Sequence, residues 1–481
     1  MRFKLKLSPE IAREIGASAF VFQHDFDFKN ALLHSITTEG LYEHLDDHGR
    51  AETLTEAFQK PPPILQQSPS PLPSPLSSLP TSPAAQSSDL PLCNNPSLTE
   101  TQKRKRKRSK QASKENRKRK RTKTGPRTAL QIEPRKDPVK RFAPDGPASS
   151  SSYTMDDAPV ASTAYVGLQD EGVEGGGGTW WLKELIGPEA AERFELIEAK
   201  PGTTVPFVDA DGRIYGLAVY PDDPGIKKCA QEAARLIQTE RSRCSFSADQ
   251  KEHRRGSFPA MGGRYVLLSQ NIVHNQANAS ALNRLTSSKP FQRLSGFATG
   301  VFKTWAPRLY RYCEDHFNDL LSSDHSLVRI FHNSVLSAAA FNFGPRTICL
   351  PHIDFGNLPF NLCWIWALGW YNWKKGGHII LWDLKLVVEF PPGSLVAIPS
   401  GVCRHSNTCV GKKEVRYSFT QYAPGGNFRW VDRGFQSEEN YHAGLTAAEA
   451  REEKLRKKAR WKMGLELFST LAELGFENEP L

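Results

Sequence analysis

Between residues 337 and 435 the apolar residues occur in short runs that are separated by turn-forming residues. The turns fall at Gly344–Pro345, at 374–377, at Asp383 and at 391–394. Runs of this length, rich in Val, Ile, Phe and Trp and spaced about 8–12 residues apart, predict β-strands. Many such strands are typical of a cupin-type jelly roll, a double-stranded β-helix whose mouth commonly hosts a metal. The predicted strands cover residues 338–343, 362–368, 378–382, 386–390, 394–398 and 415–422.

Residues 179–336 show a different pattern, in which predicted strands and helices alternate. Strands are predicted at 195–198, on both sides of an Asp211–Gly212 turn within 205–219, and from Gly263. Apolar residues at 226, 230, 233 and 237 repeat with a helical period, and those between 291 and 321 predict long helical cover. We therefore predict an α+β protein, with an α/β region at 179–336, a jelly-roll core at 337–435 and a C-terminal helical extension at 436–481.

The chain before residue 179 divides into two parts. Residues 1–60 carry only a weak helical pattern, and we expect them to be weakly structured. Residues 61–178 are rich in Pro and Ser, then in cations, and end in the glycine run 175–178. A segment of this composition buries too little apolar surface to offset its ordering entropy, so we predict a disordered linker.

The positive charge of the chain is concentrated in this linker. Residues 103–127 hold fifteen Lys or Arg and one acid, a net charge of +14, whereas the whole chain carries +11 and the remainder therefore −3. The clusters Lys103–Arg108 and Arg117–Arg121 resemble a two-part nuclear localisation signal. We expect an import receptor to bind 103–121 and the protein to be nuclear; the alternatives are a solvated charge run or a sequence-blind contact with phosphates.

Eight cysteines are scattered without a C-x-x-C pair, which excludes a zinc module of that kind and a secreted disulfide framework. No apolar run approaches the ~18 residues of a membrane span, and the charged N-terminus lacks a signal-peptide core. We therefore expect a soluble intracellular protein with no membrane partner.

Two histidines and an aspartate in the predicted core form a candidate metal site. His352 and Asp354 are two residues apart, so they leave an extended strand on the same side, and His405 follows after the 391–394 turn. In a jelly roll these two places face each other across the mouth. Two His and one carboxylate are the ligand set of a non-haem Fe(II) site that leaves three positions open. Each of these residues, taken alone, has an ordinary structural explanation. His44-x-Asp46 is a second H-x-D triplet, but no predicted strand, distal histidine or arginine supports it as a metal site.

Arg416 and Ser418 follow on the next predicted strand and point to the same side of it. The Arg416 guanidinium offers a two-pronged fork for a carboxylate, as a bound 2-oxoglutarate would need, and Ser418 offers a hydroxyl beside it. His378 is a competing metal candidate, although its place in an alternating apolar strand favours a structural or supporting role.

Several motifs within residues 337–435 carry a family resemblance, which is thinner over 180–336. The chain resembles the TET/JBP-type 2-oxoglutarate and Fe(II)-dependent dioxygenases, and is most similar to the fungal branch that often accompanies DNA transposons. The segments that carry the likeness are 342–345, His352-x-Asp354-x-x-Asn357, 367–369, 374–384, 391–394, 404–407 and 416–422.

The resemblance implies oxidation of the 5-methyl group of methylcytosine, or of thymine, in DNA, with Fe(II) and 2-oxoglutarate. His352, Asp354 and His405 match the metal ligands, Arg416 the 2-oxoglutarate clamp, and Asn357 the amide that contacts a flipped base; a turn residue is the alternative for Asn357.

Two departures from the relatives matter. Ile353 replaces a residue that is usually polar there, which puts a nearby polar contact in doubt, and the Cys-rich zinc region of animal TET proteins is missing. DNA must therefore be held elsewhere, for which residues 253–256 and the basic linker are candidates. Two alternatives stay open: the same chemistry on protein or RNA, and a catalytically inactive module tethered to nucleic acid.

Overall fold

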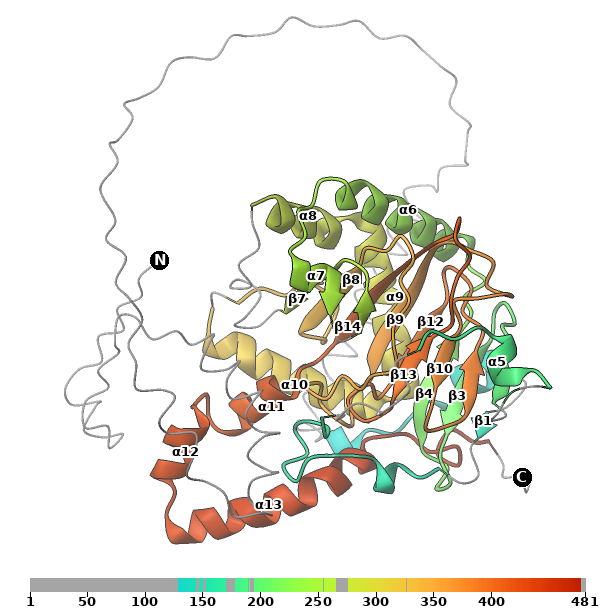
Figure 1. The fold of residues 1–481 in the computed structure, drawn as a ribbon. Coiled ribbons are helices and arrows are strands. Elements are labelled where there is room, and N and C mark those ends of the chain that lie inside the picture. The colour runs from blue at the N-terminus through green and yellow to red at the C-terminus, as the bar shows by residue number, and fades with distance from the viewer. Residues whose placement is uncertain are drawn as a thin grey trace, which may run out of the picture. The chain divides into compact units, whose positions relative to one another are not determined.

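The computed structural model describes residues 129–143, 147–149, 153–169, 178–188, 190, 194–253, 255–264, 276–325 and 327–476 (Figure 1). The basic clusters within 103–121 and the His44-x-Asp46 triplet lie outside these residues. The expectations for the segment 1–60 and for the linker up to residue 128 therefore stay predictions.

The described chain is α+β, as predicted, and its strands form two larger sheets and a hairpin. Neighbouring strands are antiparallel except in the pairs β1–β3 and β2–β11. In order, the eight-stranded sheet contains β1 (Ala148–Ser149), β3 (Thr204–Val208), β4 (Ile214–Val219), β12 (Leu395–Ile398), β9 (Cys363–Trp370), β14 (Val415–Tyr422), β8 (Ala338–Asn342) and β7 (Ala260–Arg264). The four-stranded sheet contains β13 (His405–Asn407), β10 (Ile379–Leu381), β11 (Leu386–Val388) and β2 (Glu195–Ile197), and the hairpin contains β5 (Glu252–His253) and β6 (Gly256–Ser257).

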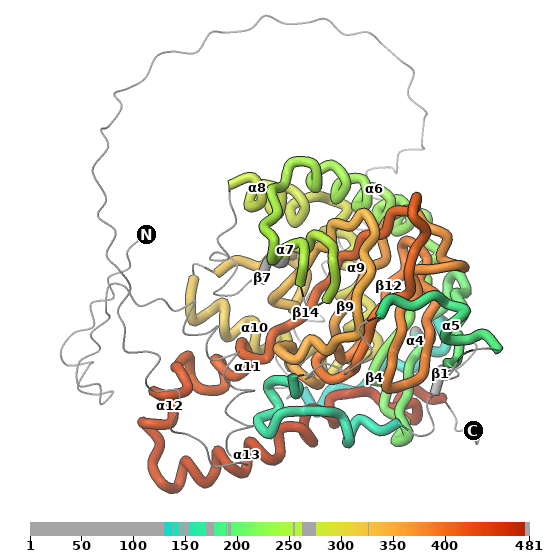
Figure 2. Tube along the Cα trace, viewed as in Figure 1, coloured from blue at the N-terminus to red at the C-terminus, as the bar shows by residue number. Residues whose placement is uncertain are grey.

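Helices cover the eight-stranded sheet on one face (Figures 1 and 2). The aromatic rings of α9 pack on those of the sheet, with Phe302 at 5.1 Å from Trp364 and Phe291 at 5.0 Å from Phe419 between ring centroids. The helices of this half are α6 (Pro224–Arg241), α7 (Ala248–Lys251), α8 (Gln276–Ser287), α9 (Lys289–Trp305) and α10 (Pro307–Ser323). The predicted helical cover at 291–321 is thus two helices. It breaks at Ala306 because a proline at 307 disfavours helical backbone in the residue before it and suits the first position of a new helix.

The alternation of β14 assigns its side chains to opposite faces. Phe419 contacts the helices, and Tyr417 lies on the same face of the strand by its period of two. Arg416 and Ser418 therefore face away from the helical cover, and both are buried. Arg416 and Ser418 therefore lie on the face of the sheet from which the chain crosses to the four-stranded sheet.

The predicted start of the folded part at residue 179 is wrong. Residues 129–169 contain α4 (Lys136–Phe142) and the short 3-10 helices Ala129–Gln131 and Met155–Asp157, and β1 also precedes the predicted boundary. Val139, Met155 and Tyr165 are at most 1% exposed. The composition of this stretch is polar on average, but a few well-spaced apolar side chains suffice to dock it.

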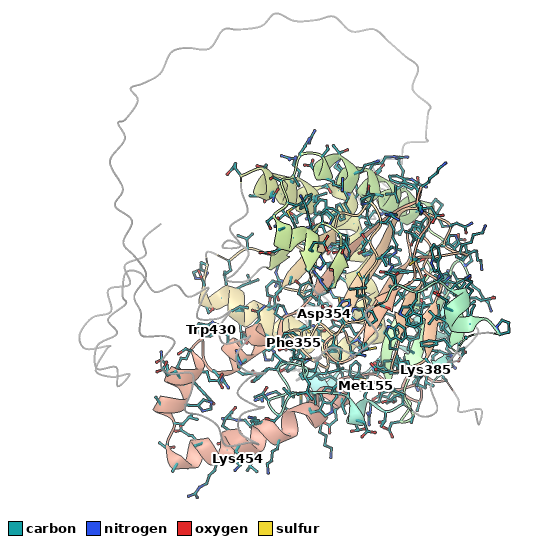
Figure 3. The ribbon with its side chains drawn as sticks, viewed as in Figure 1. Met155, Asp354, Phe355, Lys385, Trp430 and Lys454 are labelled. Atoms are coloured by element: carbon teal, nitrogen blue, oxygen red, sulfur yellow. The ribbon has the colours of Figure 1, made fainter. Side chains whose placement is uncertain are left out.

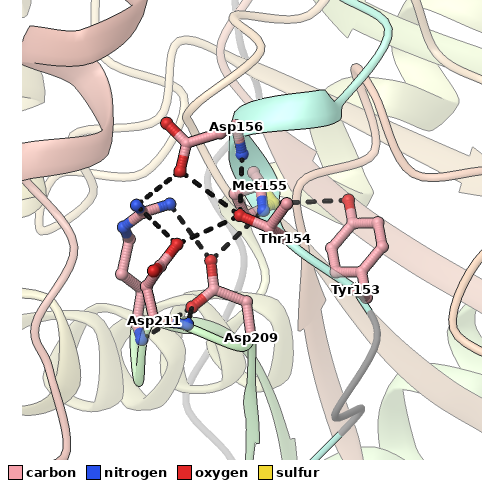
Figure 4. A network of polar contacts seen from close by, with 7 residues as sticks. Tyr153, Thr154, Met155, Asp156, Asp209 and Asp211 are labelled. Atoms are coloured by element: carbon pink, nitrogen blue, oxygen red, sulfur yellow. Dashed lines mark hydrogen bonds and ion pairs between the residues drawn. The ribbon is translucent and has the colours of Figure 1, made fainter.

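A polar network fixes this early segment to the Asp211–Gly212 turn (Figure 4). Arg213 lies 2.6 Å from Asp156 and 2.8 Å from Asp211, and its other nitrogen lies 3.1 Å from the buried Asp209. Thr154 also donates to Asp211 at 3.0 Å. One guanidinium therefore bridges three carboxylates and offsets part of their mutual repulsion.

The C-terminal part is helical and continues from the end of β14 (Figure 2). It consists of α11 (Gly425–Asp432), α12 (Glu438–Gly444) and α13 (Ala447–Glu466), while α5 (Lys183–Ile186) lies near the start of the core. Arg308 of α10 anchors the chain end through Glu473, at 2.6 and 2.8 Å. Within the described residues no helix is both long and apolar enough to cross a membrane.

Candidate metal centre

Residues 345–352 cross from one sheet to the other and carry the first predicted ligand. The crossing begins beside β14, where Arg416 N donates to Pro345 O at 2.7 Å and Thr347 N donates to Arg416 O at 3.0 Å. It ends beside β13, where His352 and His405 exchange two backbone hydrogen bonds of 3.0 Å each. This pairing brings together two histidines that are far apart in the sequence.

The three predicted metal ligands lie together. His352 Nε2 is 3.8 Å from Asp354 Oδ1, and His405 Nε2 is 3.9 Å from Asp354 Oδ2. The candidate ligand atoms all lie within 4.8 Å of one another, and no other such group of three occurs among the described residues. Both histidines are 6% exposed, whereas the Asp354 side chain is 20% exposed, so the cluster opens on the aspartate side.

Backbone carbonyls hold the Nδ1 atom of each histidine. His352 Nδ1 lies 2.7 Å from Leu350 O, and His405 Nδ1 lies 3.0 Å from Cys403 O. A carbonyl only accepts, so each Nδ1 carries the proton and donates it. In the neutral form of each imidazole, Nε2 then carries the lone pair, and it lies next to Asp354, as a metal ligand requires.

The charge state of His352 agrees with this arrangement. Burial, together with the neighbouring His405, lowers the pKa of His352 to about 3 despite the attraction of Asp354. The imidazole is therefore neutral at physiological pH and needs to lose no proton to bind a cation.

Asp354 and Asn357 are held on one turn. Asn357 N donates to Asp354 O at 2.8 Å, and Asp354 N donates to Ser400 O at 2.8 Å. The Asn357 side chain is part of this support, because its Nδ2 donates to Ser400 Oγ at 2.9 Å and the residue is only 9% exposed. The structure thus assigns Asn357 a structural contact; its predicted contact with a base stays a prediction.

Arg416 is buried at 2% exposure and has no acidic partner among the described residues. Its Nη1 donates to Thr347 O at 3.0 Å and to Asn407 Oδ1 at 3.4 Å, while its Nε has no partner. Ser418, two residues on, accepts from Asn342 Nδ2 at 2.7 Å. A buried cation without a counter-charge is unfavourable unless an anion joins it.

Two further side chains beside Arg416 also have a buried polar atom without a partner, namely Thr347 Oγ1 and His378 Nε2. Thr408 Oγ1 accepts from His378 N and lies 3.0 Å from His378 Nδ1; in the tautomer in which Thr408 donates to Nδ1, the ring proton is on Nε2. Burial, with the nearby cations Arg416 and Lys374, lowers the pKa of His378 to about 4. His378 is therefore neutral at physiological pH, and it lies outside the metal cluster. Nothing in the sequence pattern points to Thr347.

The β5–β6 hairpin is the remaining predicted contact. His253 Nε2 is engaged with Phe258 O at 3.1 Å, and Arg254 lies outside the described residues. Arg255 is close to the cluster: burial lowers its pKa, but attraction to Asp354 and other groups outweighs burial and leaves the pKa raised. The hairpin is fixed there, because Leu350 N donates to Arg255 O at 2.9 Å.

A separate cavity of about 650 Å³ lies at α5 and is lined mainly by apolar surface. Trp181, Ile186 and Lys375 are among its lining residues, and none of these belongs to the cluster or surrounds Arg416. We assign it no part in the chemistry.

Comparisons with known proteins give distant structural likenesses only. No protein-family model matches the chain, and no curated protein matches it. A solved structure described as NgTET1 in complex with 5mC DNA has a TM-score of 0.35 and 16% identity, covering 49% of this chain and 85% of that one. An oxidoreductase of the 2OG-Fe(II) oxygenase family from Burkholderia pseudomallei has a TM-score of 0.23 and 12% identity, covering 42% and 91%. Both TM-scores are low, and we draw no conclusion from either structure.

Proposed function

We propose that this chain is a 2-oxoglutarate- and Fe(II)-dependent dioxygenase that oxidises the 5-methyl group of methylcytosine, or of thymine, in DNA. The observation that carries the proposal is the His352, Asp354 and His405 cluster, in which both imidazoles contact a backbone carbonyl through Nδ1 and have Nε2 beside a carboxylate. Two His and one carboxylate with open positions are the donor set of non-haem Fe(II) oxygenases. In this proposal the two sheets are the facing sheets of a jelly roll, with the crossing segment 345–352 at its mouth.

The surroundings of Arg416 suit one carboxylate of 2-oxoglutarate. Arg416 Nε, His378 Nε2 and Thr347 Oγ1 are buried without partners, and all three can donate a hydrogen bond. A carboxylate accepts several such bonds and would also neutralise the guanidinium. These unsatisfied donors support the Arg416 assignment more directly than the sequence motif does.

Fe(II) with 2-oxoglutarate and dioxygen supplies the oxidant that attacks an unactivated C–H bond, and succinate and carbon dioxide are the co-products. The chain's own residues do the positioning. His352 and His405 are held by the Leu350 and Cys403 carbonyls, so their nitrogens keep one orientation. Asp354 lies on the exposed side, where a substrate enters, and the buried histidines exclude water behind it.

The DNA substrate rests on the motif His352-x-Asp354-x-x-Asn357 and the family resemblance. A methyl group inside duplex DNA is out of reach of a buried metal, so the base must flip out of the helix. Asn357 suits a base edge because its amide offers an acceptor and, beyond the bond to Ser400, a second N–H.

The deciding experiment incubates a methylated duplex with the full chain, Fe(II) and 2-oxoglutarate and measures hydroxymethylcytosine by mass spectrometry. We expect product from the wild type and from His44→Ala, and none from His352→Ala. Succinate release that is stimulated by peptide or RNA but not by methylated DNA would reassign the substrate. Failure to bind Fe(II) in titration would overturn the metal site and favour a non-catalytic module.

A further inference from the structure

One face of α13 carries a row of exposed cations. Arg451, Lys454, Lys458 and Lys462 are all exposed, at intervals of three, four and four residues. With 3.6 residues per turn these positions fall on a single stripe, about 16 Å long. We call these four residues the α13 stripe. Figure 3 shows Lys454 on α13, on the side away from the sheets.

The acids of α13 do not neutralise the α13 stripe. Glu453 lies 3.2 Å from Arg456 and 3.7 Å from Arg460, and Glu452 lies 3.7 Å from Arg456. Glu449 is used at the start of the helix, where its carboxylate accepts from Thr446 N at 2.8 Å. Glu466 is exposed and lies four residues after Lys462 on the same side of the helix, but among the described residues no acid forms an ion pair with a cation of the stripe. Its charge is therefore free to meet a polyanion.

The C-terminal end of α13 packs on the chain that follows Asp354. A Cβ on Gly464 would lie 2.3 Å from Phe360 Cδ1, so only a glycine permits the observed approach of the helix. The Trp461 ring lies 6.5 Å from the Phe360 ring between centroids. Phe360 is three residues beyond Asn357, so the helix ends close to the turn that carries Asp354 and Asn357.

We propose that the α13 stripe binds the sugar-phosphate backbone of duplex DNA beside the base that enters the metal centre. This inference rests on the proposed function. A length of about 16 Å matches roughly five phosphates along one strand at about 3.4 Å of axial rise each. Lysine ammonium groups hold phosphates as point charges and carry no sequence information, which suits an enzyme whose specificity lies in the flipped base.

A membrane surface is the less suitable partner for the same charges. An interfacial helix needs a broad apolar face beside its cations. On α13 the one large apolar residue that is strongly exposed is Leu455, at 67%. The stripe has cations without the apolar face that insertion requires.

The test compares the full chain with the variant Lys454→Ala/Lys458→Ala/Lys462→Ala. Binding of a fluorescent methylated duplex is followed by anisotropy over a salt series. We expect the variant to bind more weakly, and the slope of log affinity against log salt to become shallower by about 2 to 3, since each lost phosphate contact contributes about 0.9. The matched control, Lys228→Ala/Lys412→Ala/Lys413→Ala, removes three exposed lysines elsewhere and should keep the wild-type slope.

A second variant, Lys454→Arg/Lys458→Arg/Lys462→Arg, keeps the charge and should keep the slope, which separates lost charge from misfolding. An unchanged slope in the alanine variant would overturn the inference. Binding of wild type to phosphatidylserine vesicles but not to DNA, lost in the alanine variant, would overturn it too. If the wild type fails to oxidise DNA yet the alanine variant shows the shallower slope, the proposed function fails and the DNA surface stands.

Discussion

Replacing Arg416 by methionine tests whether this cation serves to bind a ligand or to stabilise the fold. Methionine has a similar length and is flexible enough to fill the space, but it has no charge. Arg416 donates to Thr347 O and Asn407 Oδ1 and also contacts the Tyr371 hydroxyl, and the first two acceptors keep another donor. Asn407 Nδ2 donates to Thr347 O at 3.2 Å, and Cys349 N donates to Asn407 Oδ1 at 2.8 Å. The substitution therefore leaves neither acceptor alone.

The expected cost follows from this geometry. Hydrogen bonds from a charged donor contribute about 1.5–3 kcal/mol, whereas burying an unpaired ion costs several kcal/mol. The two effects oppose each other, so the free energy of unfolding without ligand should fall by less than about 2 kcal/mol, or rise. With 2-oxoglutarate at about 100 times its Kd, the wild type should gain about 2.7 kcal/mol and Arg416→Met nothing.

The assay is equilibrium unfolding in urea with Mn(II) in place of Fe(II), with and without 2-oxoglutarate. Arg308→Met is the matched control, because Arg308 is also buried but pairs with Glu473 at 2.6 Å. It should lose about 2 kcal/mol and still respond to 2-oxoglutarate. The reasoning is refuted if Arg416→Met loses as much stability as Arg308→Met and still responds to the ligand.

Three further predictions concern the metal, a pH-dependent pair and cellular location. His405→Ala should abolish Mn(II) binding in calorimetry while His332→Ala, an exposed site, retains it; equal binding by both would exclude His405 as a ligand. Burial lowers the pKa of His316, but its 2.9 Å contact with Asp432 outweighs burial and leaves the pKa raised. The stability from this pair is therefore full below the ordinary pKa of about 6.5 and fades as pH rises through the raised value, so His316→Gln should destabilise more at pH 6 than at pH 9 in urea unfolding; an equal loss at both would contradict this. Replacing the cations within 103–121 by glutamine should move a fluorescent fusion out of the nucleus, and unchanged nuclear signal would remove the import prediction.

Local pattern predicted much of the core, because apolar runs and turn residues report burial directly. The strands at 338–343, 362–368 and 415–422 correspond to β8, β9 and β14 with shifts of one or two residues. The helical period at 226, 230, 233 and 237 corresponds to α6, whose first turn is capped by Asp223. Strand β13 and helix α8 were not predicted: β13 has only three residues, and α8 has a polar sequence with few apolar positions.

The sequence by itself determined the residue types of the candidate site and their order along the chain. It also predicted which of them share a side, because residues two apart in a strand point the same way, as His352 and Asp354 would, and Arg416 and Ser418. Only the tertiary structure decided which atoms of these side chains face one another. The carbonyls of Leu350 and Cys403 set the histidine protons, and backbone partners leave no trace in a side-chain pattern. The approach of His378 and Thr347 to Arg416, and of α13 to the Asp354 turn, likewise depends on how distant segments pack, which local hydrophobic periodicity does not encode.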